Sequence, residues 1–331
     1  DMNGPEVYAT IFSVGPGKVD MDVIWTGSDD GLVHVTRDGG RTWTDVTPPD
    51  MPDFGRVSQI DASAFHAGKA YVSVRLPLLD DLRPYVWKSD DYGATWTKIT
   101  DGIRDDAYVN AVREDPNREG MLYAATNHGV YASWDDGARW RELNPGLPDI
   151  PITDLIVEHD ALAIASHGRG FWVLDDVAPL RQARPGLTSE ELVLFEPPAA
   201  YRSADGATLT WWLAEEPGHA LLEIVAADGE VLRTFETAPE SEGDEAGGGR
   251  GRYGERPLEV EAGLNRFQWE LETEPWTSFP GMILWGVRTT APVVPPGRYT
   301  VRLTADGRTA TAALEVVRNP AEGIKPEIVA Q

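Results

Sequence analysis

The amino-acid sequence predicts an all-β protein: Asp-rich β-propeller blades, four of them visible, followed by a β-sandwich of the immunoglobulin or fibronectin type. The first observation is a short turn, with acids and glycine ahead of a tryptophan, that occurs three times, at 36–43, 89–96 and 133–140. The second is that short segments of β-branched and aromatic residues, without helical periodicity, precede each turn. The third is that alternating apolar and polar residues fill the C-terminal part, which is typical of a sandwich.

The turn belongs to a repeat. The tryptophans that close it, Trp43, Trp96 and Trp140, are separated by 53 and 44 residues, within reach of a blade period with variable loops. Each unit has three strand-like segments and a short one after the tryptophan, so a four-stranded sheet is expected. Such a sheet needs a neighbour to cover its apolar face, and radial stacking provides one. The expected blades are about 7–50, 56–102, 108–147 and 152–182, of which the last, with "SHGRGFWVLDD", has lost the turn.

Each turn is expected to be a structural staple. A carboxylate accepts backbone N–H groups that the turn leaves unpaired, a glycine takes the positive φ that closes it, and the indole packs beneath it and seals the blade edge. The residues expected in these roles are Asp38, Gly40 and Trp43, then Asp91, Gly93 and Trp96, then Asp136, Gly137 and Trp140.

The C-terminal part has a different organisation. Proline-rich residues 183–198 predict a connector, or a strand that closes the propeller, and residues 199–318 predict the sandwich. Ala-Asp-Gly at 227–229 and again at 305–307 predicts hairpin turns. The Gly- and acid-rich residues 238–257 predict a flexible surface loop, and 319–331 a tail.

The 331-residue chain carries 54 acidic against 29 basic residues, a net charge of −25. Such a surface repels phosphate backbones and anionic lipid, so we expect no nucleic-acid partner, and the absence of long apolar runs predicts no membrane insertion. There is no cysteine, which excludes disulfides and thiolate chemistry. The chain opens at Asp1 without an initiator methionine or signal peptide, so a trimmed form or fragment is expected.

The three turns resemble the Asp-box, or BNR repeat, S/T-x-D-x-G-x-T-W. Over 7–182, "WTGSDDGLVHVTRDGG", "LDDLRPYVWKSDDYG" and "ASHGRGFWVLDDVAPLRQ" are similar to the large bacterial BNR-repeat proteins related to the sortilin/VPS10 propeller, often labelled glycosyl hydrolases. The resemblance implies more blades than four, supplied by the same or another polypeptide, and Asp-boxes that lie on the blade periphery and are not catalytic. "GLNRFQWEL" and "PPGRYTVRL" are similar to Ig-like modules of bacterial surface and flagellar-hook-cap proteins.

Two places are candidates for ligand binding. The first is a long excursion at 75–87 between the second and third strands of the second blade, because long loops on rigid scaffolds often carry function. The second is the equivalent turn of successive blades, expected on one rim. A blade-to-blade clamp and hydrogen-bonded rim packing are the structural alternatives. The candidate residues are Arg75, Asp80, Asp81, Arg83 and Tyr85 in the excursion, and His128, His167 and Arg169 in the rim turns, with Asp29, Asp30 and Asn127 beside them.

Other motifs of the sequence give little support for a functional site. A formal GxGxxG at 249–254 lacks the flanking strand and helix that a dinucleotide site needs. Trp276 and Trp285 are candidates for a sugar platform or for a core or interdomain plug. We expect no cofactor and no metal, since His128 and His167 could bind one only if they approached each other closely.

These observations predict non-catalytic recognition or scaffolding outside the cytoplasm of a bacterium (periplasmic, cell-surface or secreted), with a protein or carbohydrate partner bound through propeller loops. The alternative is a glycoside hydrolase of sialidase or xyloglucanase type whose active site needs further blades. A third possibility is an assembly subunit such as the BNR-type factors that help build photosystems. Two inward carboxylates about 5–10 Å apart would favour the hydrolase.

Overall fold

The structure is a computed structural model of the chain, and it describes residues 9–144, 146–202, 206–238, 257–274 and 291–319. The chain divides into two compact units, 1–177 and 178–331, and each is described by itself. Among the described residues, no helix is long and apolar enough to cross a membrane.

The first unit consists of antiparallel sheets in which the strands follow one another in chain order. Three sheets have four strands and the last has three. Sheet one contains β1 (Ile11–Pro16), β2 (Ile24–Ser28), β3 (Val33–Thr36) and β4 (Thr44–Asp45); sheet two contains β5 (Arg56–Ala62), β6 (Ala70–Leu76), β7 (Asp81–Ser89) and β8 (Thr97–Lys98); sheet three contains β9 (Val109–Glu114), β10 (Leu122–Thr126), β11 (Gly129–Ser133) and β12 (Arg141–Glu142); sheet four contains β13 (Ile152–Glu158), β14 (Ala161–Ser166) and β15 (Phe171–Leu174).

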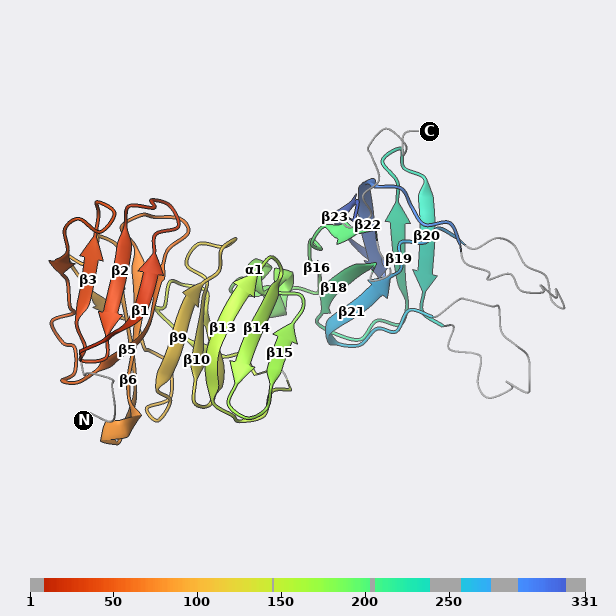
Figure 1. Cartoon of the computed structure of the whole chain (residues 1–331). Coiled ribbons are helices and arrows are strands. Elements are labelled where there is room, and N and C mark those ends of the chain that lie inside the picture. Colours follow the sequence, from red (N-terminus) through yellow and green to blue (C-terminus); the bar gives the residue numbers. More distant parts are fainter. Residues whose placement is uncertain (1–8, 145, 203–205, 239–256, 275–290, 320–331) are drawn as a thin grey trace. The chain divides into compact units, whose positions relative to one another are not determined.

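The sheets are stacked as the blades of a propeller, which confirms the predicted fold class. The first strand of each sheet lies against that of the next: β1 against β5, β5 against β9 and β9 against β13. The sheets follow one another in chain order, from red to green in Figure 1. We call them blades one to four. The prediction of four strands in every unit is wrong for blade four, because after Leu174 the described chain continues into α1 (Ala178–Gln182) instead of an outer strand.

Each apolar core of this unit lies between two blades. Alternate residues of a strand point to opposite faces of its sheet, so one face packs on the preceding blade and the other on the next. Ile60 of β5 and Val112 of β9 stand at the same position of the repeat and are 3 % and 0 % exposed. Val14 of β1 is their equivalent, yet it is 58 % exposed, because no described blade precedes blade one.

Blade four has the opposite exposed face. Phe171 and Val173 of β15 are 85 % and 61 % exposed, whereas Val33 and Val35 of β3, in blade one, are buried. Within the described residues, blades one and four therefore each have one apolar face that no other blade covers.

The second unit is a sandwich of two β-sheets. One has the order β16-β18-β21 and the other β17-β23-β22-β19-β20. A single apolar core lies between them, with Trp211 from one sheet and Leu222 and Val301 from the other. The strands are β16 (Leu192–Leu194), β17 (Ala200–Tyr201), β18 (Ala207–Leu213), β19 (Ala220–Val225), β20 (Val231–Glu236), β21 (Gly263–Trp269), β22 (Gly297–Ala305) and β23 (Arg308–Val317). The immunoglobulin-like identity of this sandwich stays a prediction.

Residues 192–194, within the segment expected to be a connector or a closing strand, form β16 and pair with β18 of the sandwich. The flexible loop predicted at 238–257, with its GxGxxG, falls on residues outside the described ranges except for its two end residues. Trp276, Trp285 and the tail beyond 319 also lie outside the described residues.

Candidate functional site

The turns at 36–43 and 89–96, called box turns below, are closed by the same hydrogen bonds. In the first, the Asp38 carboxylate accepts the Thr42 N–H at 2.9 Å and the Thr42 hydroxyl at 2.7 Å, while the Gly40 N–H donates to Thr36 Oγ1 at 2.9 Å. In the second, Asp91 accepts the same two donors from Thr95. The backbone N–H of Thr42 and then its hydroxyl lower the pKa of Asp38 to about 2, so the carboxylate stays ionised.

The third box turn, 133–140, corrects one prediction. Asp135, not Asp136, accepts the Ser133 hydroxyl at 2.7 Å and the Arg139 N–H at 2.9 Å. The carboxylate must lie two residues after the serine or threonine and five before the tryptophan to reach these donors. Asp136 occupies the next position, in the left-handed backbone conformation (φ 59°). Tyr92 (φ 60°) and Gly39 (φ 69°) have the same conformation at that position in the other two turns.

The indoles join neighbouring blades. Trp96 Nε1 donates to the Val46 carbonyl of blade one at 2.6 Å, and Trp140 Nε1 donates to the Ile99 carbonyl of blade two at 2.8 Å. Val46 and Ile99 directly follow the outer strands β4 and β8. The box turns of blades two and three thus seal the contact with the preceding blade.

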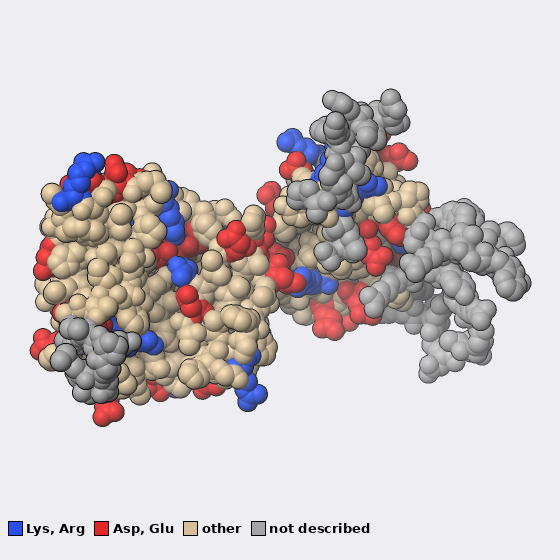
Figure 2. Space-filling view, in the orientation of Figure 1, with Lys and Arg blue, Asp and Glu red and all other residues tan. Residues whose placement is uncertain are grey.

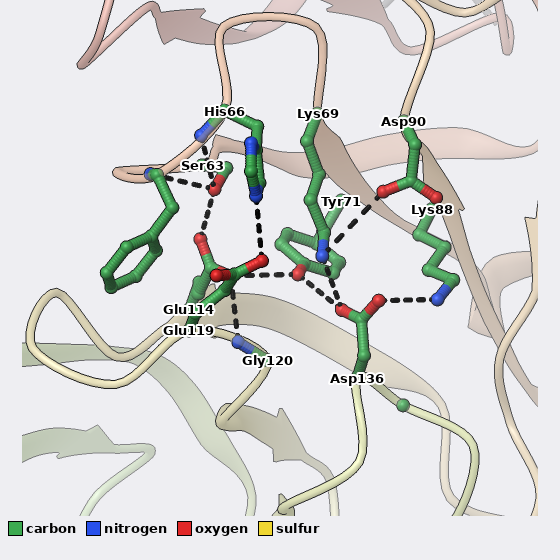
Figure 3. A network of polar contacts seen from close by, with 12 residues as sticks. Ser63, His66, Lys69, Tyr71, Lys88, Asp90, Glu114, Glu119, Gly120 and Asp136 are labelled. Carbon is green, nitrogen blue, oxygen red and sulfur yellow. Dashed lines mark hydrogen bonds and ion pairs between the residues drawn. The ribbon is translucent and has the colours of Figure 1, made fainter.

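Asp136 belongs to a polar cluster between blades two and three (Figure 3). Its carboxylate contacts Lys69 Nζ at 2.9 Å and Lys88 Nζ at 2.5 Å, and it accepts the Tyr71 hydroxyl at 2.6 Å. The same hydroxyl lies 3.1 Å from Glu114 Oε1. We call these five residues the interblade cluster.

Burial and charge act in opposite directions in the interblade cluster. Burial tends to raise the pKa of Asp136, but hydrogen bonds from Lys88, Tyr71 and Lys69 outweigh it and lower the pKa. Burial tends to lower the pKa of Lys69, yet Asp136 raises it. For Tyr71, burial and the Glu114 charge both raise the pKa. Tyr71 is therefore neutral, and Asp136 and Lys69 are charged, at neutral pH, so the cluster links blades two and three by a buried ion pair.

The sequence did not single out this cluster. Glu114 also accepts the buried Ser63 hydroxyl at 2.5 Å and the Gly120 N–H at 3.1 Å. Nearby, Asp61 accepts Lys18 Nζ at 2.9 Å and the Glu114 N–H at 3.0 Å. The only available signal was a second acid, Asp136, where the other two box turns have glycine and tyrosine.

The prediction of a long loop at 75–87 is wrong, because residues 75–76 end β6 and residues 81–87 begin β7, so that only the tip of this hairpin is a turn. The strands meet at Leu76 and Asp81, and the 3₁₀ turn η1 (Pro77–Leu79) joins them, with Asp80 in the left-handed conformation (φ 59°). The turn, in orange, projects beyond the ends of the neighbouring strands (Figure 1). Leu78 at this tip is 83 % exposed, and Leu79 and Leu82 are exposed beside it.

Three predicted residues of the excursion are brought together. Asp81 receives two bonds from the Arg83 guanidinium, at 2.9 and 2.6 Å, and accepts the Tyr85 hydroxyl at 2.9 Å. The Arg83 hydrogen bonds hold the pKa of Asp81 well below its usual range. The Tyr85 ring is buried and stacks on Trp87, with ring centroids 5.8 Å apart. Arg75 is not part of the group, since its Nη1 donates to Asn110 Oδ1 of blade three at 2.6 Å.

The rim turns lie at equivalent positions, between the second and third strands of their blades, but each bonds to its own surroundings. Asp29 accepts the N–H groups of residues 9 and 10, which lead into β1. His128 Nδ1 contacts Asp149 at 2.8 Å, and the His167 N–H donates to the Pro151 carbonyl at 2.8 Å. Arg169 is exposed. Within the described ranges, no group of three or more His, Cys, Asp or Glu side chains is arranged to hold a metal ion.

Charged residues of both signs are mixed on the visible surface. On the face shown in Figure 2, lysines and arginines are scattered among acidic and uncharged residues and form no continuous patch. This agrees with the net charge of −25.

Comparisons with known proteins were made by sequence and by structure. No protein-family description and no curated protein matches the sequence. Among solved structures, the chain is similar to YCF48 from Cyanidioschyzon merolae, with 19 % identity, a TM-score of 0.39, and coverage of 62 % of this chain and 67 % of that one. It is similar to a GH74 enzyme of Niastella koreensis, with 12 % identity, a TM-score of 0.39, and coverage of 71 % of this chain and 31 % of that one.

A structure titled YCF48 bound to D1 peptide also matches, with 17 % identity, a TM-score of 0.37, and coverage of 65 % and 78 % of the two chains. The chain spans about one third of the length of the GH74 enzymes it matches. At these identities and TM-scores the function of this chain has to be argued from its own residues.

Proposed function

We propose that this protein is a non-catalytic recognition protein that binds a protein partner through the leucine tip of the excursion. The observation that carries the proposal is Leu78, which is 83 % exposed on a short turn beside Leu79. Burying one leucine side chain contributes about 1.5–3 kcal/mol, so a partner with an apolar groove gains affinity from the tip.

The base of the excursion is braced, which favours binding by a preformed tip. Asp81, Arg83 and Tyr85 bond to one another along β7 below the leucines, and Asp81 pairs with Leu76 of β6. A tip that is already ordered loses little conformational freedom on binding.

The same residues favour a protein over a carbohydrate partner. Sugar rings stack on exposed aromatic faces, and the two aromatic rings of the excursion, Tyr85 and Trp87, are 5 % and 1 % exposed. They also argue against a hydrolytic acid here, because a general acid needs a raised pKa and the pKa of Asp81 is lowered. In blades two and three, the buried Asp61 and Glu114 are fully engaged by donors.

The further parts of the proposal rest on the sequence. We assign the chain to the bacterial BNR-repeat proteins related to sortilin, supported by the shared hydrogen bonds of the box turns. We place it outside the cytoplasm, as that resemblance implies. Its partners include further propeller blades from the same or another polypeptide.

The test is selection of binding peptides on the intact chain. A phage-displayed library of random 12-residue peptides is panned on the immobilised protein, and the affinity of selected peptides is compared with Leu78→Asp and Leu79→Asp variants. Peptides with two or more apolar side chains are expected, with at least tenfold weaker binding to either variant. Met21→Asp is the matched control, since Met21 is equally exposed elsewhere in the same unit.

Selected peptides that bind both leucine variants undiminished would overturn the proposal, and so would the failure to select any. The same preparation is assayed on fluorogenic glycosides. Turnover that is lost in Asp80→Ala or Asp81→Ala would identify a glycoside hydrolase instead.

A further inference from the structure

Blade two carries two arginines that stand directly opposite each other. Arg56 opens β5 and pairs with Arg75, the last residue but one of β6. Like charges at opposite positions of neighbouring strands destabilise a sheet, because the two side chains lie on the same face. The pKa of Arg75 reflects this position, since burial and then the Arg56 charge lower it. We call these two residues the arginine pair.

The arginine pair has no acidic partner within the part of the chain that the structure describes. Arg75 donates to the amide oxygen of Asn110 at 2.6 Å, and the Arg56 guanidinium lies 4.9 Å from the centre of the Phe12 ring. Both contacts are with uncharged groups, although the chain has 54 acidic against 29 basic residues. The two arginines are half-buried, and a charge that leaves water without a counter-charge is costly. An anion from outside the chain would therefore stabilise the pair.

Other arginines of the described chain already have such a counter-charge. The pKa of Arg83, Arg104 and Arg302 is raised, in each case mainly by hydrogen bonds to a carboxylate. The pKa of Arg75 moves in the opposite direction. A guanidinium has five N–H donors, and the contact with Asn110 uses one of those of Arg75. The arginine pair thus has donors that no described carboxylate uses.

The arginine pair lies close to the leucine tip. Arg75 is followed by Leu76, where β6 ends, and Leu78 comes three residues after Arg75. Three residues span at most about 11 Å, so one short peptide can contact both. The neighbouring charges of the hairpin do not compete for the same anion, because Asp81 and Arg83 neutralise each other.

We propose that the arginine pair binds a carboxylate of the peptide that the leucine tip recognises, so that the partner is a segment with both apolar and acidic side chains. This inference rests on the proposed function and names the chemistry of its partner. Guanidinium groups bind carboxylates through paired N–H donors, which fixes the direction of the peptide and adds affinity. An extended peptide advances about 3.4 Å per residue. The acid should therefore lie within about three residues of the apolar side chain that contacts Leu78.

The charge of the whole protein limits how acidic the partner can be. A net charge of −25 repels ligands that carry many negative charges, and two arginines compensate only locally. One or two carboxylates beside apolar side chains fit this balance, whereas a polyanion does not.

The test uses the peptides selected on the intact chain. One selected peptide is synthesised with its acid and with the corresponding amide, Asn or Gln. The affinity of both forms for the parent protein, Arg56→Gln and Arg75→Gln is measured by fluorescence anisotropy. We expect the acidic form to bind either variant at least tenfold more weakly than it binds the parent. The amide form should bind the parent about tenfold more weakly, and the two variants should change its affinity less than about twofold.

Two variants serve as controls. Arg41→Gln removes an exposed arginine of blade one and changes the net charge equally, so it should bind the acidic peptide as the parent does. Arg75→Lys keeps the charge and should recover part of the affinity that Arg75→Gln loses. The comparison of the two peptide forms on the parent does not alter the protein, so it holds even if a variant folds poorly.

The inference and the proposed function fail in different ways. Peptides that require Leu78 but bind Arg56→Gln and Arg75→Gln undiminished overturn the carboxylate site and leave the leucine tip in place. An equal loss in Arg41→Gln also overturns it, because the effect is then one of net charge. Peptides that require the arginines but not the leucines support the carboxylate site and refute the tip. If no peptide is selected, both proposals are overturned.

Discussion

The indole Nε1 of Trp140 donates a hydrogen bond to the carbonyl oxygen of Ile99 at 2.8 Å, across the boundary between blades three and two. The side chain is 2 % exposed, so the bond lies out of water and its loss leaves a buried acceptor unpaired. The box turn of blade three is therefore part of the contact with blade two, and removing the Trp140 side chain should destabilise that contact.

Trp140→Ala should lower the free energy of unfolding by about 3–5 kcal/mol, as expected for removing a buried aromatic side chain. Trp43→Ala should cost less than about 1 kcal/mol, since Trp43 is half-exposed and has no described blade to pack on. Differential scanning calorimetry of the two variants and the parent measures both. Equal losses would show that Trp43 is also packed on a partner.

Gly137→Ala should be more destabilising than Gly40→Ala. Both glycines have positive φ, 80° and 91°, which costs a residue with a Cβ about 1–2 kcal/mol. At Gly137 the new methyl group would also collide with Ile99, adding about 1–3 kcal/mol, whereas Gly40 faces open space. Urea titrations give the difference, and a larger loss at Gly40 would contradict the packing described here.

Asp135→Ala and Asp136→Ala should have separable effects on the third box turn. The first removes the acceptor of the Arg139 N–H, so hydrogen exchange at that amide should accelerate. The second leaves that bond in place and removes the partner of Lys69 and Lys88. Exchange at Arg139 should then stay slow while thermal stability falls. Rapid exchange at the Arg139 amide in Asp136→Ala alone would show that Asp136, and not Asp135, accepts this N–H group.

The stabilisation by Asp136 should depend on pH. Its pKa is lower in the folded protein than in the unfolded chain, so its contribution is present above about pH 4 and is lost as pH falls through the lowered pKa. Asp136→Asn should therefore lower Tm at pH 7 and have a shrinking effect below about pH 4. A constant difference in Tm across that range would show that the charge of Asp136 does not matter. Asn tolerates the left-handed backbone, so the variant isolates the charge.

The blade architecture could be predicted because short-range sequence patterns determine it. Short strands, acidic turns and tryptophans at a fixed place recur in the same order, and each copy alone indicates a hairpin. The outer strands at 44–45, 97–98 and 141–142 were expected from the short segment after each tryptophan. The missing outer strand of blade four follows from residues beyond Leu174 that turn into a helix, which the shared pattern did not specify.

The contacts between blades were harder to predict. Tyr71 and Glu114 are far apart in the sequence, and only the stacking of two sheets brings the hydroxyl within 3.1 Å of the carboxylate. The prediction that Asp136 closes the third box turn is wrong for a different reason. Two consecutive acids precede Gly137, and the prediction takes the one nearer the glycine. Counting five residues back from Trp140 selects Asp135, as it selects Asp91 from Trp96. In the excursion, the chemistry of Asp81 and Arg83 was apparent from the sequence, but their mutual neutralisation was not.

The fourth residue of the box turn has a consequence for how such a chain can be rearranged. Tyr92 is matched to Arg37, and Asp136 to Lys69 and Lys88, so each blade recognises the one before it. Exchanging blades two and three would place Asp136 against Arg37, and Tyr92 against blade three, where Ala132 stands at the position of Lys88. Each exchanged blade would lose the partner that this residue has in the present order, which makes the order of the blades a property of the folded molecule as well as of the gene.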